Sequence, residues 1–252
     1  MKFFYKLYVN FDNFISSLLF FNVFKINSKR WGVIPCSKTE RINSGDVLEY
    51  NNEKLLNYYY EVTSQDDSYR GWYRNKYASL VNNKKVLDLG CGLGRDGIFF
   101  LENQANVTFA DINLNNILLV EKICKAKNLK SEYKYLKSYS DFEDLIKFDY
   151  IFAIGSLINN PKKITKKIIK ILIRNNPGCR FVFLGYPKER WINEGKKSFR
   201  TWGSKTDGGA PWIEYYDLEK INYVFNNKYS KIKETNYKNE FNLFEIDILE
   251  VI

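Results

Sequence analysis

The sequence of 252 residues contains no histidine, and this absence narrows the chemistry that the protein can perform. Ser-His-Asp and Cys-His nucleophile systems are excluded, because both need an imidazole. Any general base must then be an aspartate, a glutamate, a lysine, a tyrosine or a water molecule. Cysteines are also few, and no two of them form a C-x-x-C pair; they are Cys36, Cys91, Cys124 and Cys179. We therefore expect neither a metal site of the usual zinc kinds nor a disulfide framework, and we expect reduced thiols in a cytoplasmic protein.

An apolar run long enough to cross a membrane is missing as well. The most apolar stretch, FISSLLFFNVF at residues 14–24, has about half the length that a transmembrane helix needs. No small-residue cleavage site of a signal peptide follows it. We expect its aromatic side chains to pack on the domain or to cover a pocket, and contact with a membrane surface is an alternative that the sequence leaves open.

Acidic residues are fewer than basic residues. The chain has 39 lysines and arginines against 29 aspartates and glutamates, which gives a net charge of +10. This excess favours an anionic partner, such as a phosphorylated small molecule, a nucleic acid or a membrane surface. The alternative is that most of the lysines are solvated surface residues. With 45% hydrophobic residues, the chain is long enough to bury the core of one α/β domain with a short extra segment.

A repeated strand and helix pattern begins near residue 84. We predict five strands at 84–90, 106–112, 132–139, 148–155 and 176–187, with helices after the first, the second and the fourth. An amphipathic helix is predicted before them at 68–82, and a helix that Asp217 can cap is predicted after them at 216–227. Two consecutive strands follow at 229–238 and 241–252. Alternation of this kind forms a parallel sheet with right-handed crossovers. In the last strand, Glu245 and Asp247 alternate with apolar residues, which predicts one solvent-exposed face.

The stretch VLDLGCGLGRDG, residues 86–97, fits two nucleotide-binding patterns. Gly90, Gly92 and Gly94 form G-x-G-x-G, whereas Gly92, Gly94 and Gly97 form the G-x-G-x-x-G pattern of dinucleotide sites. An acidic residue at the end of the second strand, Asp111, suits either pattern. The first pattern is favoured because Asp88 lies within the strand, and because too few strands follow for a second nucleotide-binding half. Gly97 is then explained as a small residue that lets the helix start pack closely on the sheet.

The motifs, taken in this order and spacing, resemble those of class I S-adenosylmethionine-dependent methyltransferases over about residues 68–252. VLDLGCGLG is similar to the first motif of that family, FADIN to the second, FDYIFAIGSL to the fourth-strand motif and NPGCRFVF to the turn before strand five. The resemblance implies a three-layer α/β/α Rossmann-like sheet of seven strands, mostly parallel with the last strand antiparallel. It also implies S-adenosylmethionine as cofactor and S-adenosylhomocysteine as product. Residues 1–67 would form an N-terminal helical and aromatic lead.

The resemblance also implies which residues bind the cofactor. Asp88 would orient the amino end of the cofactor, Asp111 would accept both ribose hydroxyls, and Ile112 would touch the adenine. Asp141 would accept a hydrogen bond from the adenine amino group, with Ser140 and Phe142 as neighbouring alternatives. The remaining positions would face the methionine part or form the floor of the site, namely Gly90, Cys91, Gly92, Gly155 and Ser156. The structural alternatives are that Asp88 caps the glycine loop and that Asp111 caps the second helix.

Residues 185–217, after the fifth strand, bear on the methyl acceptor. Aromatic and charged side chains interleave there, which suits a pocket for a small polar molecule. Similar segments form the substrate lid in small-molecule methyltransferases; the alternative is a surface loop. The candidate catalytic residues are Tyr186, Asp207 and Glu214 as bases, and Arg190 as the group that orients an anion.

We expect O-methylation of a small anionic or sugar-type acceptor, such as a phosphorylated or nucleotide-linked precursor of a surface polysaccharide. An RNA acceptor is a weaker alternative, because basic and aromatic side chains together can stack bases. A hydrophobic acceptor of the quinone or lipid type is another. A DNA partner is not expected, because the motifs that nucleic-acid amino and cytosine methyltransferases carry after strand four are absent from IGSLINNP.

Overall fold

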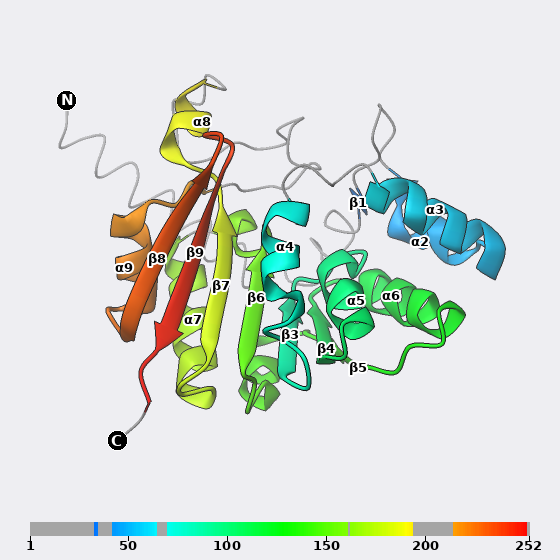
Figure 1. Cartoon of the computed structure of the whole chain (residues 1–252), viewed down its shortest axis with the longest axis horizontal. Helices are drawn as coiled ribbons and strands as arrows, with labels where there is room; N and C mark the ends of the chain where they lie inside the picture. The colour runs from blue at the N-terminus through cyan, green and yellow to red at the C-terminus, as the bar shows by residue number, and fades with distance from the viewer. Residues whose placement is uncertain (1–32, 35–41, 65–69, 161, 194–213, 251–252) are drawn as a thin grey trace.

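The structure is a computed structural model, and it describes residues 33–34, 42–64, 70–160, 162–193 and 214–250. Its centre is a seven-stranded sheet with the order β5-β4-β3-β6-β7-β9-β8 (Figure 1). The strands are β3 (Lys85–Leu89), β4 (Asn106–Asp111), β5 (Glu132–Tyr135), β6 (Tyr150–Ile154), β7 (Arg180–Gly185), β8 (Tyr229–Tyr237) and β9 (Phe241–Ile248). The first five pair in parallel, whereas β9 is antiparallel to both β7 and β8. This confirms the predicted sheet with its antiparallel last strand.

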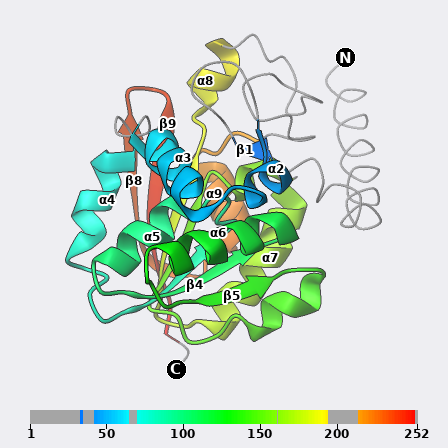
Figure 2. The same cartoon turned by 90° about the vertical axis from the view of Figure 1, so that its right-hand side faces the viewer.

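Helices cover both faces of the sheet, as the three-layer prediction requires (Figures 1 and 2). One face packs against α4 (Arg70–Ala78), α5 (Arg95–Glu102) and α6 (Leu114–Ala126). The other packs against α7 (Lys162–Asn175), α9 (Leu218–Phe225) and the short 3-10 helix η1 (Tyr139–Asp144). Successive strand residues such as Val86 and Leu87 belong to opposite cores, because side chains alternate across a strand. A strand buried on both faces reads as a continuous apolar run, which is the pattern that the sequence shows.

The described part of the N-terminal lead packs on the sheet domain. It contains the short pair β1 (Val33–Ile34) and β2 (Ile42–Asn43), followed by α2 (Ser44–Leu48) and α3 (Asn52–Ser64). Lys122 of α6 donates a hydrogen bond to the carbonyl oxygen of Leu48 at 2.6 Å. Val47 and Leu55 are fully buried in the core that covers one face of the sheet. The apolar run 14–24 lies outside the described residues, and the boundary at residue 67 stays a prediction.

The C-terminal segment corrects one prediction. Glu245 was expected on a solvent-exposed face of β9, but it is only 6% exposed. The reason is that β9 lies between β7 and β8 rather than at the sheet edge, and the Lys76 and Tyr77 side chains of α4 donate hydrogen bonds to its carboxylate. Asp247 is partly exposed and pairs with Arg180, with 2.6 Å between Oδ1 and Nε. The predicted cap is confirmed, since Asp217 Oδ1 accepts a hydrogen bond from the Lys220 N–H at the start of α9.

Among the helices within the described ranges, none combines the length and the apolar character that crossing a membrane requires.

Candidate active site

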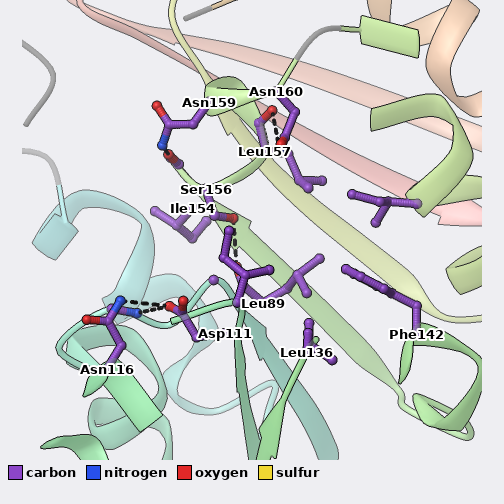
Figure 3. Close-up of a pocket in the computed structure, with 15 residues that line it drawn as sticks. Leu89, Asp111, Asn116, Leu136, Phe142, Ile154, Ser156, Leu157, Asn159 and Asn160 are labelled. Atoms are coloured by element: carbon purple, nitrogen blue, oxygen red, sulfur yellow. Dashed lines mark hydrogen bonds between the residues drawn. The ribbon is translucent and has the colours of Figure 1, made fainter. Parts of the chain in front are cut away.

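A pocket opens where the carboxyl ends of β3, β4 and β6 meet (Figure 3). The chain passes from β3 outward to β4 and β5, and then returns to the other side of β3 to form β6. Such a reversal leaves a crevice at the carboxyl edge of a parallel sheet, where ligands bind in open α/β folds. The pocket encloses about 180 Å³. Six of the predicted cofactor residues line it: Gly90, Gly92, Asp111, Ile112, Gly155 and Ser156.

The glycines of the pocket have two kinds of surroundings. Gly90 lies against Ser156, so a Cβ at Gly90 would overlap the serine side chain. Ser156 in turn donates a hydrogen bond to the Leu89 carbonyl oxygen at 2.6 Å, which ties the loop after β6 to the end of β3. At Gly92 and Gly155, by contrast, a Cβ would meet no atom within 4 Å. The backbone therefore leaves open room on the pocket side, as a ligand approaching the main chain requires.

Asp88 of β3 fixes the start of α5 by a hydrogen bond. Its Oδ2 accepts a hydrogen bond from the Gly97 N–H at 3.0 Å, and the residue is 4% exposed. A Cβ at Gly97 would overlap the Phe109 ring, which confirms that this glycine permits close packing of helix on sheet. Cys91 is also buried, and burial raises the pKa of its thiol. Both Asp88 and Cys91 lie beside the pocket and not among its lining residues, so their roles toward the cofactor stay predictions.

Asp111 lies at the carboxyl end of β4, and its carboxylate accepts hydrogen bonds from backbone and side-chain groups. Its Oδ2 accepts hydrogen bonds from the Gly92 N–H at 2.9 Å and from Asn116 Nδ2 at 3.1 Å, and its Oδ1 accepts one from the Asn113 N–H at 2.8 Å. Burial raises the pKa of this carboxyl above its ordinary value, although the hydrogen bonds from Gly92 and Asn113 act in the opposite direction. The carboxylate thus joins the glycine loop to the start of α6 and also faces the pocket (Figure 3).

An apolar slot adjoins Asp111. Its walls are formed by Ile112, Leu136, Phe142, Leu157 and Ile168. Apolar side chains of this kind suit the ring of an aromatic base. Phe142, named as an alternative on the third-strand loop, is one of these residues.

Asp141 lies elsewhere. Its carboxylate accepts hydrogen bonds from the Lys137 and Ser138 N–H groups at 2.6 and 2.7 Å, in a capping box that begins η1. The predicted third strand also ends early, at Tyr135, because the chain turns into this capped segment. Asp141 is next to the pocket residue Phe142 and not itself among the lining residues, so its role toward the adenine stays a prediction.

Three asparagines of the pocket were not anticipated from the sequence: Asn116, Asn159 and Asn160. Asn116 could have been found, because it falls in the first turn of the helix that follows Asp111. Asn159 ends the short 3-10 helix η2 (Leu157–Asn159) after β6, and Asn160 follows it as the C-cap; no motif indicated this conformation.

Two of the candidate catalytic residues, Tyr186 and Arg190, contact each other just after β7, the next strand after β6. The backbone of Tyr186 pairs with that of Tyr215, and the Tyr186 carbonyl oxygen accepts a hydrogen bond from the Tyr216 N–H at 2.9 Å. The guanidinium of Arg190, on α8 (Lys188–Asn193), lies 3.9 Å from the centre of the Tyr186 ring and 5.0 Å from that of Phe241. Asp207 lies outside the described residues.

Glu214 connects this region to the pocket. Its N–H donates a hydrogen bond to the Ile158 carbonyl oxygen at 2.8 Å, in the loop that supplies the pocket asparagines. Its side chain is 3% exposed and forms an ion pair with Lys220, whose side chain is 12% exposed. Burial lowers the pKa of Lys220, and the Glu214 charge acts against that effect.

The residues of the pocket fit the adenosine part of the expected cofactor. A carboxylate faces the pocket beside an apolar slot, and two glycines leave room for a ligand against the main chain. Within the described ranges, no group of three or more His, Cys, Asp or Glu side chains could hold a metal ion.

Comparison with known families gives one match across the first part of the sheet domain. Residues 50–183, which are 134 of the 252 residues, match the family model described as tellurite resistance protein TehB. The uncharacterized protein RP789 of Rickettsia prowazekii (strain Madrid E) is 31% identical over 112 residues. That alignment covers 43% of this chain but 20% of the relative, so the chain spans about a fifth of that protein's length.

Solved structures share the fold at low sequence identity. Magnesium protoporphyrin IX methyltransferase (ChlM) from Synechocystis PCC 6803, with bound SAH, has a TM-score of 0.57 at 14% identity and covers 94% of this chain and 99% of its own. TehB from Haemophilus influenzae has a TM-score of 0.54 at 14% identity, over 75% of this chain and 66% of its own. Since the family match covers more than half of the chain, the chain belongs to the family described as tellurite resistance protein TehB.

Proposed function

We propose that this chain is an S-adenosylmethionine-dependent methyltransferase that methylates an oxygen atom of a small anionic acceptor. The observation that carries the proposal is the position of Arg190 at the end of β7, one strand away from the cofactor pocket. Its contacts with the Tyr186 and Phe241 rings fix the plane of the guanidinium. A guanidinium held in this way suits a carboxylate or phosphate, which it can bind with two parallel hydrogen bonds.

The surroundings of Glu214 also support an acceptor that arrives as an oxyanion. Glu214 forms a buried ion pair with Lys220, so it would have to give up that partner to act as a base. An oxyanion needs no base. A hydroxyl acceptor would need one, and Tyr186 and Asp207 are then the proposed bases.

In the chemical step, the main task of the protein is to position the acceptor relative to the methyl group. When bound, S-adenosylmethionine supplies a methyl group that the sulfonium charge has already activated. The chain then has to hold an acceptor oxygen in line with that methyl group, and such alignment alone can lower a barrier by several kcal/mol. We assign the alignment of the acceptor to Arg190. Most of the predicted lid at 185–217 lies outside the described residues, at 194–213.

Two acceptor chemistries fit a small anion. One is a phosphorylated or nucleotide-linked sugar, such as a precursor of a surface polysaccharide. The other is an inorganic oxyanion, which the family description suggests because it refers to tellurite. Both would present charged oxygens to Arg190.

Labelled S-adenosylmethionine tests the acceptor class. The full chain is incubated separately with nucleotide sugars and sugar phosphates, with tellurite, with RNA and with a lipid extract. The proposal predicts methyl transfer to one of the first two pools. Label that enters RNA or lipid, and neither small-anion pool, would overturn it.

Arg190→Gln tests the residue that carries the proposal. Loss of a charge-assisted hydrogen bond costs about 1.5–3 kcal/mol, so KM for the acceptor should rise roughly 10- to 150-fold. Binding of S-adenosylhomocysteine should not change. The matched control is Lys188→Gln, which removes an exposed charge from the same helix and should leave KM unchanged. An Arg190→Gln enzyme with the wild-type KM would contradict the assignment.

A further inference from the structure

Four aromatic side chains follow one another along the carboxyl edge of the sheet, outside the cofactor pocket. Trp72 of α4 lies against Tyr237 at the end of β8, with 5.1 Å between the ring centres. Tyr237 is paired in register with Phe241 at the start of β9, so their side chains lie on the same face of the hairpin. The Phe241 ring in turn lies 5.7 Å from the Tyr186 ring, centre to centre. We call these four residues the aromatic row; Figure 2 shows α4 beside the β8–β9 hairpin.

Both ends of the aromatic row are fixed to the active site. At one end, Tyr73 follows Trp72 and donates a hydrogen bond to Asp96 in the first turn of α5, directly after the glycine loop. At the other end, the backbone of Tyr186 pairs with that of Tyr215. The row therefore extends from the glycine loop to the end of β7, along the edge to which the proposed function assigns the acceptor.

The four side chains of the aromatic row are all partly exposed. The distances of 5.1 and 5.7 Å between neighbouring ring centres leave no room for a third ring, because a ring stacked between two others needs about 7 Å. A planar ligand can therefore stack only against the outer side of the row. Contacts of this kind accept any nucleobase, since every base has a π-face.

Two cations lie beside the aromatic row. The Arg190 guanidinium contacts the Tyr186 and Phe241 rings. Lys238, in the turn between β8 and β9, has its Nζ 5.3 Å from the centre of the Tyr237 ring. Rings with positive charge next to them suit a planar molecule that carries phosphate groups.

We propose that the aromatic row holds the base of a nucleotide-linked acceptor, and that Arg190 and Lys238 hold its diphosphate. This inference rests on the proposed function and selects between its two acceptor chemistries, because an inorganic oxyanion has no ring for the row to bind. An RNA strand would need a basic track that continues past the row. The exposed Glu189 and Glu240 instead lie next to Arg190 and Phe241 in the sequence.

Calorimetric titration of the full chain tests the inference. The protein is saturated with S-adenosylhomocysteine, so that nucleotides cannot enter the cofactor pocket, and the probes are uridine diphosphate, guanosine diphosphate and inorganic diphosphate. At least one nucleotide should bind more tightly than inorganic diphosphate. Tyr237→Leu and Phe241→Leu should weaken binding of that nucleotide roughly 5- to 150-fold, the range for loss of one stacking contact. Neither variant should change the affinity for inorganic diphosphate.

Two further variants separate the ring from the charge. Tyr237→Phe keeps the ring and should bind the nucleotide as the wild type does. Lys238→Asn removes the charge and should weaken binding of the nucleotide and of inorganic diphosphate by a similar factor. Lys238 has a φ of 50°, which asparagine adopts more readily than most residues, so this substitution should not disturb the turn.

Tyr223→Leu is the matched control. Tyr223 is an exposed tyrosine of α9, and Lys166 Nζ lies 4.2 Å from its ring centre. It resembles the residues of the aromatic row in chemistry, but its helix covers the opposite face of the sheet from α4. Its loss should leave nucleotide binding unchanged. Thermal unfolding of each variant shows that it is folded.

Three results would overturn the inference: nucleotides that bind no more tightly than inorganic diphosphate, an equal loss of nucleotide binding in Tyr223→Leu and Phe241→Leu, or tighter binding of a uridine tetranucleotide without terminal phosphates than of either nucleotide. The proposed function survives any of them if labelled methyl groups enter tellurite or sugar phosphates. It fails separately if the nucleotides bind as expected but the label enters only RNA or lipid.

Discussion

Gly90 and Gly155 have nearly the same backbone conformation, with φ of 69° and 70°, but different surroundings. A Cβ at Gly90 would overlap Ser156, whereas a Cβ at Gly155 would enter the open pocket. Packing therefore excludes a side chain at Gly90, whereas a side chain at Gly155 would take up space in the pocket. Both glycines nevertheless belong to sequence motifs that suggest only a cofactor loop.

Alanine at these two positions should have distinct effects. Gly155→Ala should cost about 1–2 kcal/mol in unfolding free energy, because a residue with a Cβ is strained at positive φ. Gly90→Ala should cost that amount and about 1–3 kcal/mol more, because of the overlap with Ser156. Denaturant unfolding measures both values. Equal losses in the two variants would show that the loop after β6 adapts to the added methyl group.

The positions of these pocket residues were predictable from the sequence where a motif fixes the backbone. Gly90, Gly92 and Gly155 follow strand ends, Asp111 ends β4, and the sheet order brings strand ends together. The hydrogen bonds of Asp141 were not predictable, because its carboxylate accepts them from the N–H groups of its own loop, and its contact with the adenine stays a prediction.

At the scale of elements, the pattern of buried strands and amphipathic helices predicted every strand from β3 to β9. The burial of the face of β9 that carries Glu245 was not predictable. Alternation in 241–252 indicates a strand, but it does not show that β8 takes the edge and that α4 supplies donors to Glu245. Two side chains from a helix more than 160 positions earlier decide the environment of this carboxylate.

Glu245 should make the stability of the fold depend on acidic pH. Burial raises the pKa of Glu245, but the hydrogen bonds from Lys76 and Tyr77 outweigh burial, and the pKa lies below its ordinary value of 4.5. A lowered carboxyl pKa stabilises the fold above the ordinary value, and this stabilisation is lost as the pH falls from 4.5 through the folded-state pKa. At pH 7, Glu245→Gln should cost about 1–3 kcal/mol, the scale for hydrogen bonds to a buried charge.

Unfolding of the wild type and Glu245→Gln between pH 7 and pH 3 measures this dependence. The difference between the two proteins should shrink below pH 4.5. Glu240→Gln, an exposed glutamate in the turn between β8 and β9, is the control and should behave as the wild type at every pH. A difference that stays constant to pH 3 would mean that the charge of Glu245 does not stabilise the fold.

At the scale of the whole molecule, the reversal of strand order about β3 places the site. The carboxyl ends of the parallel strands β4, β3, β6 and β7 lie in that order along one edge of the sheet, and they carry Asp111, the glycine loop, Gly155 with Ser156, and Tyr186. The cofactor pocket and the candidate acceptor residues are therefore neighbours by topology. Connection rules predict this arrangement from the order of elements, whereas the acceptor is not fixed by the fold.

Calorimetric titration with S-adenosylhomocysteine and with NADH tests most directly the claim that the loop at residues 86–97 and Asp111 bind an S-adenosyl cofactor. The wild type should bind S-adenosylhomocysteine and show no binding of NADH. Asp111→Ala should weaken S-adenosylhomocysteine binding by at least about 1.5–3 kcal/mol, the cost of losing a hydrogen bond to a charged group. Binding of NADH in place of S-adenosylhomocysteine, or an unchanged affinity in Asp111→Ala, would contradict the claim.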